Sequence, residues 1–455
     1  MLPDYSDADF LLFLPLATRD SSGNLVPRLA RSWETSEDGS EVTYHLRTDV
    51  RWHDGVPVTA HDIKYTLDLL AHPEVAEYAF DSVAALTDST VLIQNRQHHY
   101  VDDIVFYPRH LIQGLEPAKF FDWDFWHQPV GNGPYRFARY EPATLIELEA
   151  NPDFYAGQPA IASVIVRFLG SIDASLNELL AGRADVAESR YLASRDAVST
   201  DPRYERYVRY LGATAVLFLN HNLPFFSDPR VRRALVLALD RRALSEAIGL
   251  PPDLPIVDGL FTVEQLVRGE LPHAFDHDPD QARRLLDEAG WVDADGDGRR
   301  EREGVAARFE ILAPPWWERS AVLVDAQLAD VGIEVELFVA DRSVNLERYR
   351  RGDFEAAIGF VTPWGLGFLQ GRDSPSGYGN ETYKSLARQA SATPSPALRD
   401  SLIRETWPHL IRDVPAVFLH PMATQFYVHR RIRGLSSPWR ADAARYMDEL
   451  WIEED

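Results

Sequence analysis

The part of the sequence that most constrains the fold lies between residues 308 and 361. Residues 308–313 form an apolar run that two prolines end, residues 318–330 carry apolar side chains at helical spacing, and residues 332–340 alternate between apolar and polar. These patterns predict a strand, a helix and a second strand. This order is typical of a βαβ crossover, which joins two parallel strands of one sheet. The apolar run 354–361 predicts a further parallel strand, so the region as a whole predicts an α/β fold.

A similar order of elements occurs much earlier in the chain. Residues 163–169 predict a strand, residues 173–181 a helix, and residues 186–187 the start of another strand. Between the two regions, Asp228 and Asp278 each precede a proline, and apolar residues follow at helical spacing. Proline is favoured at the first position of a helix, so both aspartates predict helix starts. The sequence therefore predicts two α/β units with helices between them.

The N-terminal third has a different pattern. Residues 42–46 and 90–93 predict antiparallel strands, with a helix between them. The helix is predicted to start at Thr59, and Asp62 stands where a capping box usually has Glu or Gln. We therefore expect a separate α+β segment here.

Charge and cysteine content exclude several classes of function. The chain has 70 acidic and 46 basic residues, a formal net charge of −24. Nucleic acids and anionic lipids bind through basic patches, so this balance argues against both as partners. The absence of cysteine excludes disulfides, thiolate metal sites and cysteine nucleophiles, and it is compatible with an oxidising extracytoplasmic space. Residues 1–4 lack the features of a signal peptide, so we expect either a cytoplasmic protein or a signal sequence absent from this chain.

Recognisable catalytic motifs are lacking. The sequence has no Gly-x-Ser-x-Gly and no His-Glu-x-x-His, and residues 131–134 (Gly-Asn-Gly-Pro) lack the strand-to-helix context of a phosphate loop. His98 and His99 are adjacent, so on a strand they would point to opposite faces, and we expect a solvated pair rather than a metal site. We therefore expect a protein that is not an enzyme. A carbohydrate-acting hydrolase stays an alternative, because dispersed carboxylates can form a glycosidase pair.

The acidic turn after residue 292 resembles a calcium-binding loop. Oxygen-bearing residues alternate along it, and Gly298 supplies the sharp turn. Gly304 replaces the usual Glu of the twelfth position, and Glu303 lies one residue earlier. We expect no cofactor apart from a structural Ca²⁺ here, and the alternative is an acidic, solvated turn. The candidate ligands are Asp293, Asp295, Asp297, Arg299 and Glu301.

Six blocks of sequence, in order along almost the whole chain, resemble one family. The most recognisable is residues 52–62, with an aromatic residue, an Asp-Gly turn and a Thr-Ala-x-Asp helix start. The others lie at residues 27–47, 131–135, 151–155, 220–241 and 308–354. Together they resemble the bacterial extracellular solute-binding proteins of family 5, the dipeptide-, oligopeptide- and nickel-binding components of ABC importers.

The resemblance implies an α/β, two-lobed periplasmic-binding-protein fold (type II, cluster C) with an extra N-terminal α+β domain. Lobe I would comprise residues 1–34, 131–225 and 416–455, the extra domain residues 35–130, and lobe II residues 226–415.

The resemblance also implies a function. The protein would capture a small molecule or a peptide between its lobes by hinge closure and deliver it to an ABC permease in the membrane. It would be a monomer in the periplasm or outside the cell, associated with the membrane through a lipid anchor or the permease. A periplasmic sensor or chaperone with the same fold stays an alternative, because the sequence does not separate these roles.

The loop after residues 354–361 is a candidate ligand site, because open α/β sheets bind ligands beyond the carboxyl ends of their strands. Trp364 and Phe368 lie in this loop, and Arg372 beyond it either supplies a charge to the ligand or lies in a solvated loop. Peptide-binding members of the family carry an acidic residue here for the peptide's amino terminus, but residues 362–368 have none. Peptide is the ligand that the family implies, and oligosaccharide and metal chelate stay as alternatives.

Two further pairs of residues are candidate ligand contacts. Trp316 and Trp317 follow the strand of residues 308–313, and they either stack on a sugar or an apolar side chain or pack between domains. Asn220 and Asn222 follow an apolar strand at the expected hinge. Asn220 either bonds the ligand or caps the crossing.

Overall fold

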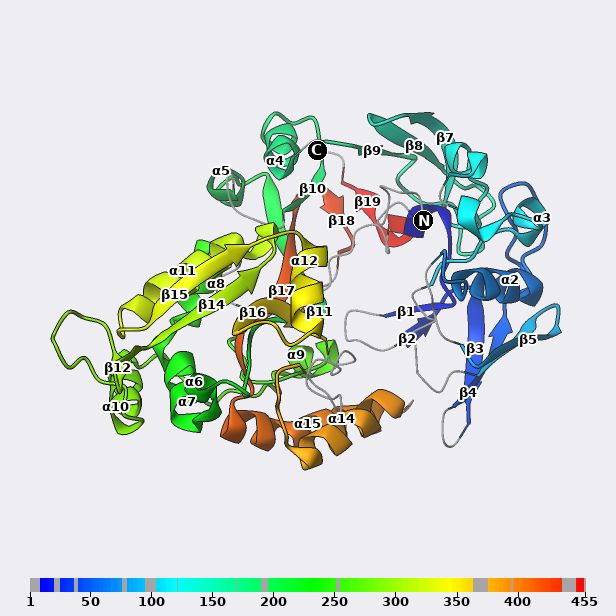
Figure 1. Ribbon diagram of the computed structural model, residues 1–455. Helices are drawn as coiled ribbons and strands as arrows, with labels where there is room; N and C mark the ends of the chain where they lie inside the picture. Colours follow the sequence, from blue (N-terminus) through cyan, green and yellow to red (C-terminus); the bar gives the residue numbers. More distant parts are fainter. Residues whose placement is uncertain are drawn as a thin grey trace.

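The computed structural model describes residues 9–19, 25–36, 40–75, 80–94, 104–120, 122–169, 171–189, 195–250, 254–362, 375–393, 396–435 and 447–453. Its ribbon forms two bodies that lie side by side (Figure 1). Each body has its own apolar core, one built by residues 11–161 with Met447 and Leu450, the other by residues 208–423. We call residues 9–169 and 432–453 the first lobe, and residues 171–431 the second lobe.

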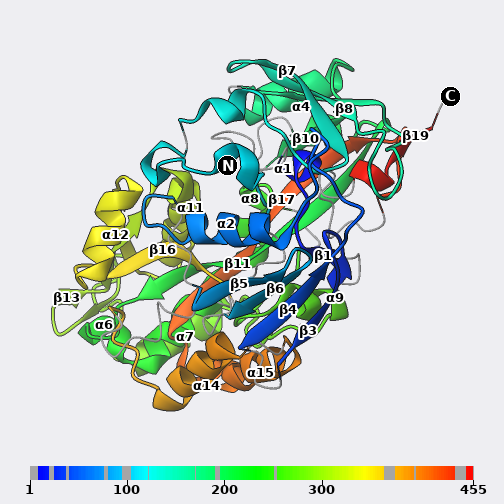
Figure 2. The ribbon, with the colours of Figure 1, turned by 90° about the vertical axis from the view of Figure 1, so that its right-hand side faces the viewer.

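The first lobe contains an antiparallel four-stranded sheet with the order β3 (Ala30–Thr35), β4 (Glu41–Leu46), β6 (Thr90–Gln94) and β5 (Ser82–Thr87). The pairing of β4 with β6 confirms the antiparallel strands expected in the N-terminal third. Helix α2 (Ala60–Leu70) packs against β5 and β6 (Figure 2). Its start is as predicted, because the Asp62 carboxylate accepts a 2.8 Å hydrogen bond from the Thr59 N–H.

The remaining elements of the first lobe lie around this sheet. They are α1 (Asp9–Leu12), β1 (Ala17–Arg19), β2 (Leu25–Pro27), α3 (Arg109–Ile112), β7 (Tyr135–Glu141), β8 (Leu145–Ala150), β9 (Ser163–Arg167), β18 (Ile432–Arg433) and β19 (Trp451–Ile452).

The second lobe contains a six-stranded mixed sheet. Its order is β10 (Val186–Ser189), β17 (Ala416–His429), β11 (Tyr204–Leu219), β16 (Ala356–Val361), β14 (Arg308–Ala313) and β15 (Glu334–Val339). β14 pairs in parallel with both β15 and β16, and helix α11 (Glu318–Ala329) connects β14 to β15. The βαβ crossover and the third parallel strand are therefore confirmed.

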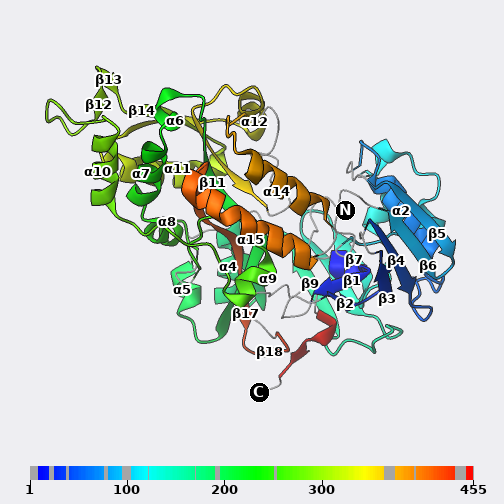
Figure 3. The same cartoon turned by 90° about the horizontal axis from the view of Figure 1, so that it is seen from below.

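Helices cover both faces of this sheet. Side chains of α7 (Pro229–Ala238), α8 (Arg241–Ala247), α10 (Pro279–Glu288) and α11 share one core with Ala215 and Leu217. Side chains of α12 (Arg342–Arg350), α14 (Glu381–Ala392) and α15 (Pro396–Asp413) share the other with Val216 and Phe218, and Figure 3 shows α14 beside α15. The shorter helices are α4 (Ile172–Leu180), α5 (Arg195–Ser199), α6 (Pro224–Ser227) and α9 (Val263–Arg268).

The helix starts predicted at Asp228 and Asp278 are confirmed. Each carboxylate accepts a 2.8 Å hydrogen bond from a backbone N–H in the first turn of its helix, that of Arg230 and that of Gln281. Among the described residues, no helix combines the length and the apolar character needed to cross a bilayer.

The prediction of an α/β unit at residues 163–187 is wrong. Its elements form as β9, α4 and β10, but β9 pairs with β8 in the first lobe, whereas β10 pairs antiparallel with β17 in the second. The chain crosses between lobes here, so the helix does not return the chain to the same sheet.

The lobes are joined by two crossings, one between β9 and α4 and one between β17 and β18. Beside the first, Glu178 of α4 accepts hydrogen bonds from Arg167 at the end of β9 and from Arg183, at 2.7 Å for Arg183. At the second, Ile432 and Leu435 pack against the first-lobe core and against side chains of β11 and β17. The predicted five-segment division of the chain has one boundary at 225/226, inside α6, and one at 415/416, where β17 begins, and the division stays a prediction.

Candidate functional site

The central pair of strands in the second lobe is bent. β11 and β17 are antiparallel, and their register shifts between Tyr210 and Thr214 and again between Ala215 and Val216. Beyond the first shift, β11 also pairs with β16, and Thr214 lies opposite Val361. The carboxyl end of β16 therefore meets β11 where β11 bends, and the side of an α/β sheet at the carboxyl ends of its parallel strands is where ligands bind.

Trp316 and Trp317 lie at this edge, just after β14, as expected. The Trp316 side chain is exposed, with 52% of its surface accessible, whereas Trp317 is buried in the core that α11 shares with the sheet. The Trp317 ring centroid lies 6.0 Å from that of His420 on β17. Only Trp316 of the pair thus offers a free aromatic surface, and the ligand contacts of both residues stay a prediction.

His420 is a buried polar residue that sequence reasoning missed. Its Nδ1 lies 3.0 Å from the Pro421 carbonyl oxygen, and no described group hydrogen-bonds to its Nε2. Burial lowers the pKa of His420 to about 4, so the imidazole is neutral at physiological pH. His420 lies opposite Ala215, at the bend in β11. The sequence does not reveal this pairing, so it gave no reason to select His420.

Asn220 and Asn222 lie at the opposite ends of the strands from Trp316, where the parallel strands begin. Because β11 is antiparallel to β16, its end at Leu219 pairs with the beginning of β16. The Asn220 Nδ2 donates a 2.8 Å hydrogen bond to the Phe354 carbonyl oxygen, and Asn220 Oδ1 accepts bonds of 3.1 and 3.0 Å from Asn222 N and Nδ2. The structure therefore does not bring these residues together with Trp316.

The expected position of Asn220 at the hinge stays a prediction. The segments on both sides of it, at Leu219 and Phe225, belong to the same second-lobe core. Trp364, Phe368 and Arg372 lie outside the described residues, so the loop that was expected to carry the ligand stays a prediction.

Three polar side chains that sequence reasoning missed lie together on one face of β10, β17 and β11. Arg209 on β11, Thr424 on β17 and Glu188 on β10 are neighbours, and the Thr424 hydroxyl donates a 2.7 Å hydrogen bond to Glu188 Oε1. Thr424 lies 215 positions after Arg209 and 236 positions after Glu188, so only the pairing of the strands reveals that these residues are close.

The acidic turn places the side chains of Asp293, Asp295 and Asp297 close together. One carboxylate oxygen from each lies within 4.8 Å of the others, and all three residues are exposed. Asp293 accepts hydrogen bonds of 2.8 and 3.0 Å from the Gly296 and Gly298 N–H groups. The remaining candidate ligands lie apart from this group: Glu301 accepts a bond from the Ala294 N–H, and the Arg299 side chain forms an ion pair with Glu334.

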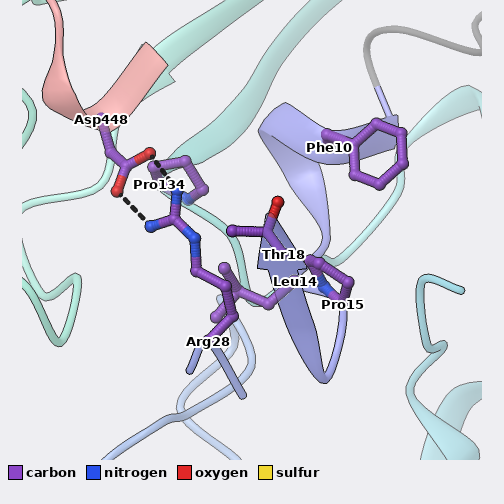
Figure 4. Close-up of a pocket in the computed structure, with 7 residues that line it drawn as sticks. All are labelled: Phe10, Leu14, Pro15, Thr18, Arg28, Pro134 and Asp448. Atoms are coloured by element: carbon purple, nitrogen blue, oxygen red, sulfur yellow. Dashed lines mark hydrogen bonds and ion pairs between the residues drawn. The ribbon is translucent and has the colours of Figure 1, made fainter. Parts of the chain in front are cut away.

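Two cavities lie away from the sheet edge. One, of about 10 Å³, adjoins the buried ion pair between Arg28 and Asp448, whose N–O distance is 2.7 Å (Figure 4). It has room for about one water molecule. The other, of about 300 Å³, lies at the start of α8 and is lined by Arg241, His273 and His277 among others.

Comparison with known proteins identifies relatives of the chain. The family model described as bacterial extracellular solute-binding proteins, family 5 Middle, matches residues 24–384. A Brucella ovis protein named for peptide binding in an ABC transporter is 28% identical over 305 residues. That match covers 62% of this chain and 56% of the relative, so the chain matches little more than half of the relative's length.

Solved structures match the fold over nearly the whole chain. The oligopeptide-binding protein AppA of Bacillus subtilis, solved with a nonapeptide, has a TM-score of 0.73 at 21% identity, covering 99% of this chain and 94% of AppA. NikA of Brucella suis, solved with Fe(III)-EDTA, has a TM-score of 0.79 at 21% identity, covering 99% and 96%. The expected two-lobed fold is therefore confirmed.

Proposed function

The chain belongs to the bacterial extracellular solute-binding proteins of family 5, and from this membership we propose that it captures a solute between its two lobes for the permease of an ABC importer. The family consists of binding proteins and not of enzymes. The observation that carries the proposal is the family match over residues 24–384, which includes parts of both lobes.

The arrangement of the lobes supports this proposal. Two crossings join lobes that have separate cores, and such an arrangement allows closure around a ligand with little change inside either lobe. Trp316 offers an exposed aromatic surface just beyond the carboxyl end of the parallel strand β14.

A peptide is the ligand that membership of the family favours, and an oligosaccharide or a metal chelate is the alternative. A nonapeptide and Fe(III)-EDTA occupy AppA and NikA, so the fold accommodates both chemistries. The partner is a membrane permease, and the protein acts as a monomer in the periplasm or outside the cell, held at the membrane by a lipid anchor or by the permease.

Ligand binding is expected to be stoichiometric, non-destructive and coupled to closure. Calorimetry with short peptides, oligosaccharides and metal chelates would find the ligand, and small-angle scattering should then show a smaller radius of gyration on saturation. Mass spectrometry of the recovered mixture is the control for chemistry. Turnover of any compound would contradict the proposal and favour the carbohydrate-acting hydrolase, and binding without a change in radius would contradict lobe closure.

We also propose that the acidic turn binds Ca²⁺ as a structural ion through Asp293, Asp295 and Asp297. After chelation, 10 mM CaCl₂ is expected to raise the melting temperature, because an ion that binds only the native state stabilises it by about 1–3 kcal/mol at ~10–100 times its Kd. Asp295→Ala is the matched variant, and it should abolish the rise. The Asp295 carboxylate accepts a hydrogen bond from the Asp297 N–H within this turn, so the substitution removes a candidate ligand with little change to the fold. An unchanged melting temperature in the wild type would reduce the motif to a solvated turn.

A further inference from the structure

Arg167 and Glu178 belong to different lobes and lie on either side of the first crossing. Arg167 is the last residue of β9, and it pairs with Leu145 of β8 in the first lobe. Glu178 lies on α4, whose Leu176 and Leu179 are buried in a cluster of second-lobe residues. Each of the two charged residues is therefore attached to the frame of its own lobe.

The side chains of these two residues join the lobes directly. The Arg167 Nη1 donates a hydrogen bond to Glu178 Oε2. Within the part of the chain that the structure describes, this is the single ion pair between one lobe and the other. At the second crossing, the apolar side chains of Ile432 and Leu435 pack against both lobes. Apolar contacts have no preferred direction, whereas a charged hydrogen bond fixes two head groups relative to each other.

Glu178 also has a partner within its own lobe. Arg183, in the turn between α4 and β10, donates hydrogen bonds of 3.1 Å from Nε to Glu178 Oε2 and of 2.7 Å from Nη2 to Oε1. Such a fork of two bonds holds a carboxylate in a fixed orientation. The hydrogen bonding from Arg183 and the charge of Arg167 outweigh the effect of burial and lower the pKa of Glu178 to about 2, so its carboxylate stays ionised.

The contact between Arg167 and Glu178 can break without stranding a charge. The Arg167 side chain is 42% exposed, so water can solvate its guanidinium, and Glu178 keeps Arg183 as its counter-charge. Arg241 and Asp258, which are both only 3% exposed, form an ion pair of a different kind. Separating that pair would leave two buried charges without partners, which is costly.

We propose that the Arg167–Glu178 ion pair is a releasable latch that holds the two lobes in the relative orientation of this structure. A rotation of one lobe about the crossings moves Arg167 relative to Glu178, so other orientations weaken or lose the pair. The latch therefore sets how easily the lobes change orientation, although neither residue needs to touch a solute. The inference rests on the proposed function only in that solute capture requires this change of orientation.

The test measures the orientation of the lobes in the full chain without a solute. Because the chain has no cysteine, Asp88→Cys and Glu381→Cys place one spin label on each lobe at exposed sites, and electron paramagnetic resonance gives the distances between the labels. In Arg167→Gln, the proportion of molecules outside the main wild-type distance should rise about 2–5-fold, the effect expected of an exposed ion pair. Arg167→Lys should restore part of the wild-type distribution. Raising NaCl to about 1 M should shift the wild type in the same way and leave Arg167→Gln unchanged, since salt screens the pair.

Arg139→Gln is the matched control. Arg139 is 52% exposed, and its ion pairs with Glu141 and Glu147 lie within the first lobe. The variant removes the same charge without changing a contact between the lobes, so its distances should match those of the wild type. The melting temperature of each variant shows that it folds. A wild-type distribution in Arg167→Gln, or an equal shift in Arg139→Gln, would overturn the inference. Neither result bears on whether a solute closes the lobes, which small-angle scattering tests separately.

Discussion

Gly131→Ala is expected to destabilise the protein by more than about 4 kcal/mol, which is beyond the range of ordinary substitutions. A Cβ at Gly131 would lie 1.9 Å from the Leu12 carbonyl oxygen, a distance that forces the backbone to move. The same carbonyl accepts hydrogen bonds of 2.9 and 2.8 Å from the Asn132 and Gly133 N–H groups, and Asn132 Oδ1 accepts one from the Leu14 N–H. The substitution thus separates two segments that build the first-lobe core. Chemical denaturation followed by tryptophan fluorescence measures the loss.

Gly379→Ala is the control for this prediction. A Cβ at Gly379 meets no atom within 4 Å, and its φ is not positive. Its effect is expected to stay within about 0.5 kcal/mol, as for other surface substitutions. A Gly131→Ala protein as stable as the Gly379→Ala protein would show that the approach to Leu12 is not tight in solution.

Asp258→Ala is expected to cost about 3–5 kcal/mol, because it leaves the Arg241 charge buried without its counter-charge. The Asp258 carboxylate also accepts hydrogen bonds of 2.6 and 3.0 Å from the Ala274 and Phe275 N–H groups, and these would be lost as well. Arg241 additionally donates to three backbone carbonyl oxygens, those of Val257, Phe275 and Phe418, so it cannot easily leave for solvent. Urea denaturation of each variant provides the free energies.

The exposed pair of Arg136 and Asp153 is the control. Its N–O distance is similar, at 2.7 Å, but the Asp153 side chain is 80% exposed. Asp153→Ala should therefore cost less than about 1 kcal/mol. The double variant Arg241→Met/Asp258→Ala should recover part of the loss if the unpaired charge is its cause. Equal costs at Asp153 and Asp258 would mean that burial does not amplify the ion pair.

Local signals made part of the fold predictable. Two aspartates followed by prolines gave the starts of α7 and α10, and the alternation around residues 308–361 gave the parallel strands, because caps and strand patterns depend on residues close in sequence. The resemblance of six blocks to one family supplied the two-lobed architecture, which local patterns alone do not contain.

Long-range pairing made the rest unpredictable. β9 and β10 have the composition of one βαβ unit, yet each pairs in a different sheet. β11 pairs with β17, some 200 positions later, and its antiparallel direction puts Asn220 at the far edge from Trp316. For the same reason Arg209 and His420 did not appear among the candidates, since their neighbours come from strands whose order the sequence does not state.

The two crossings also impose an order on biosynthesis. The second lobe is inserted into the first, whose core includes Met447 and Leu450 and whose Arg28 is neutralised by Asp448. The ribosome makes residues 9–169 long before Asp448, and domains tend to fold as units while the chain emerges. The N-terminal segments must therefore wait, with part of their apolar surface uncovered and Arg28 without its carboxylate, while the whole inserted lobe is made. That interval, which ends when Asp448 is in place, is when the nascent chain most needs a chaperone.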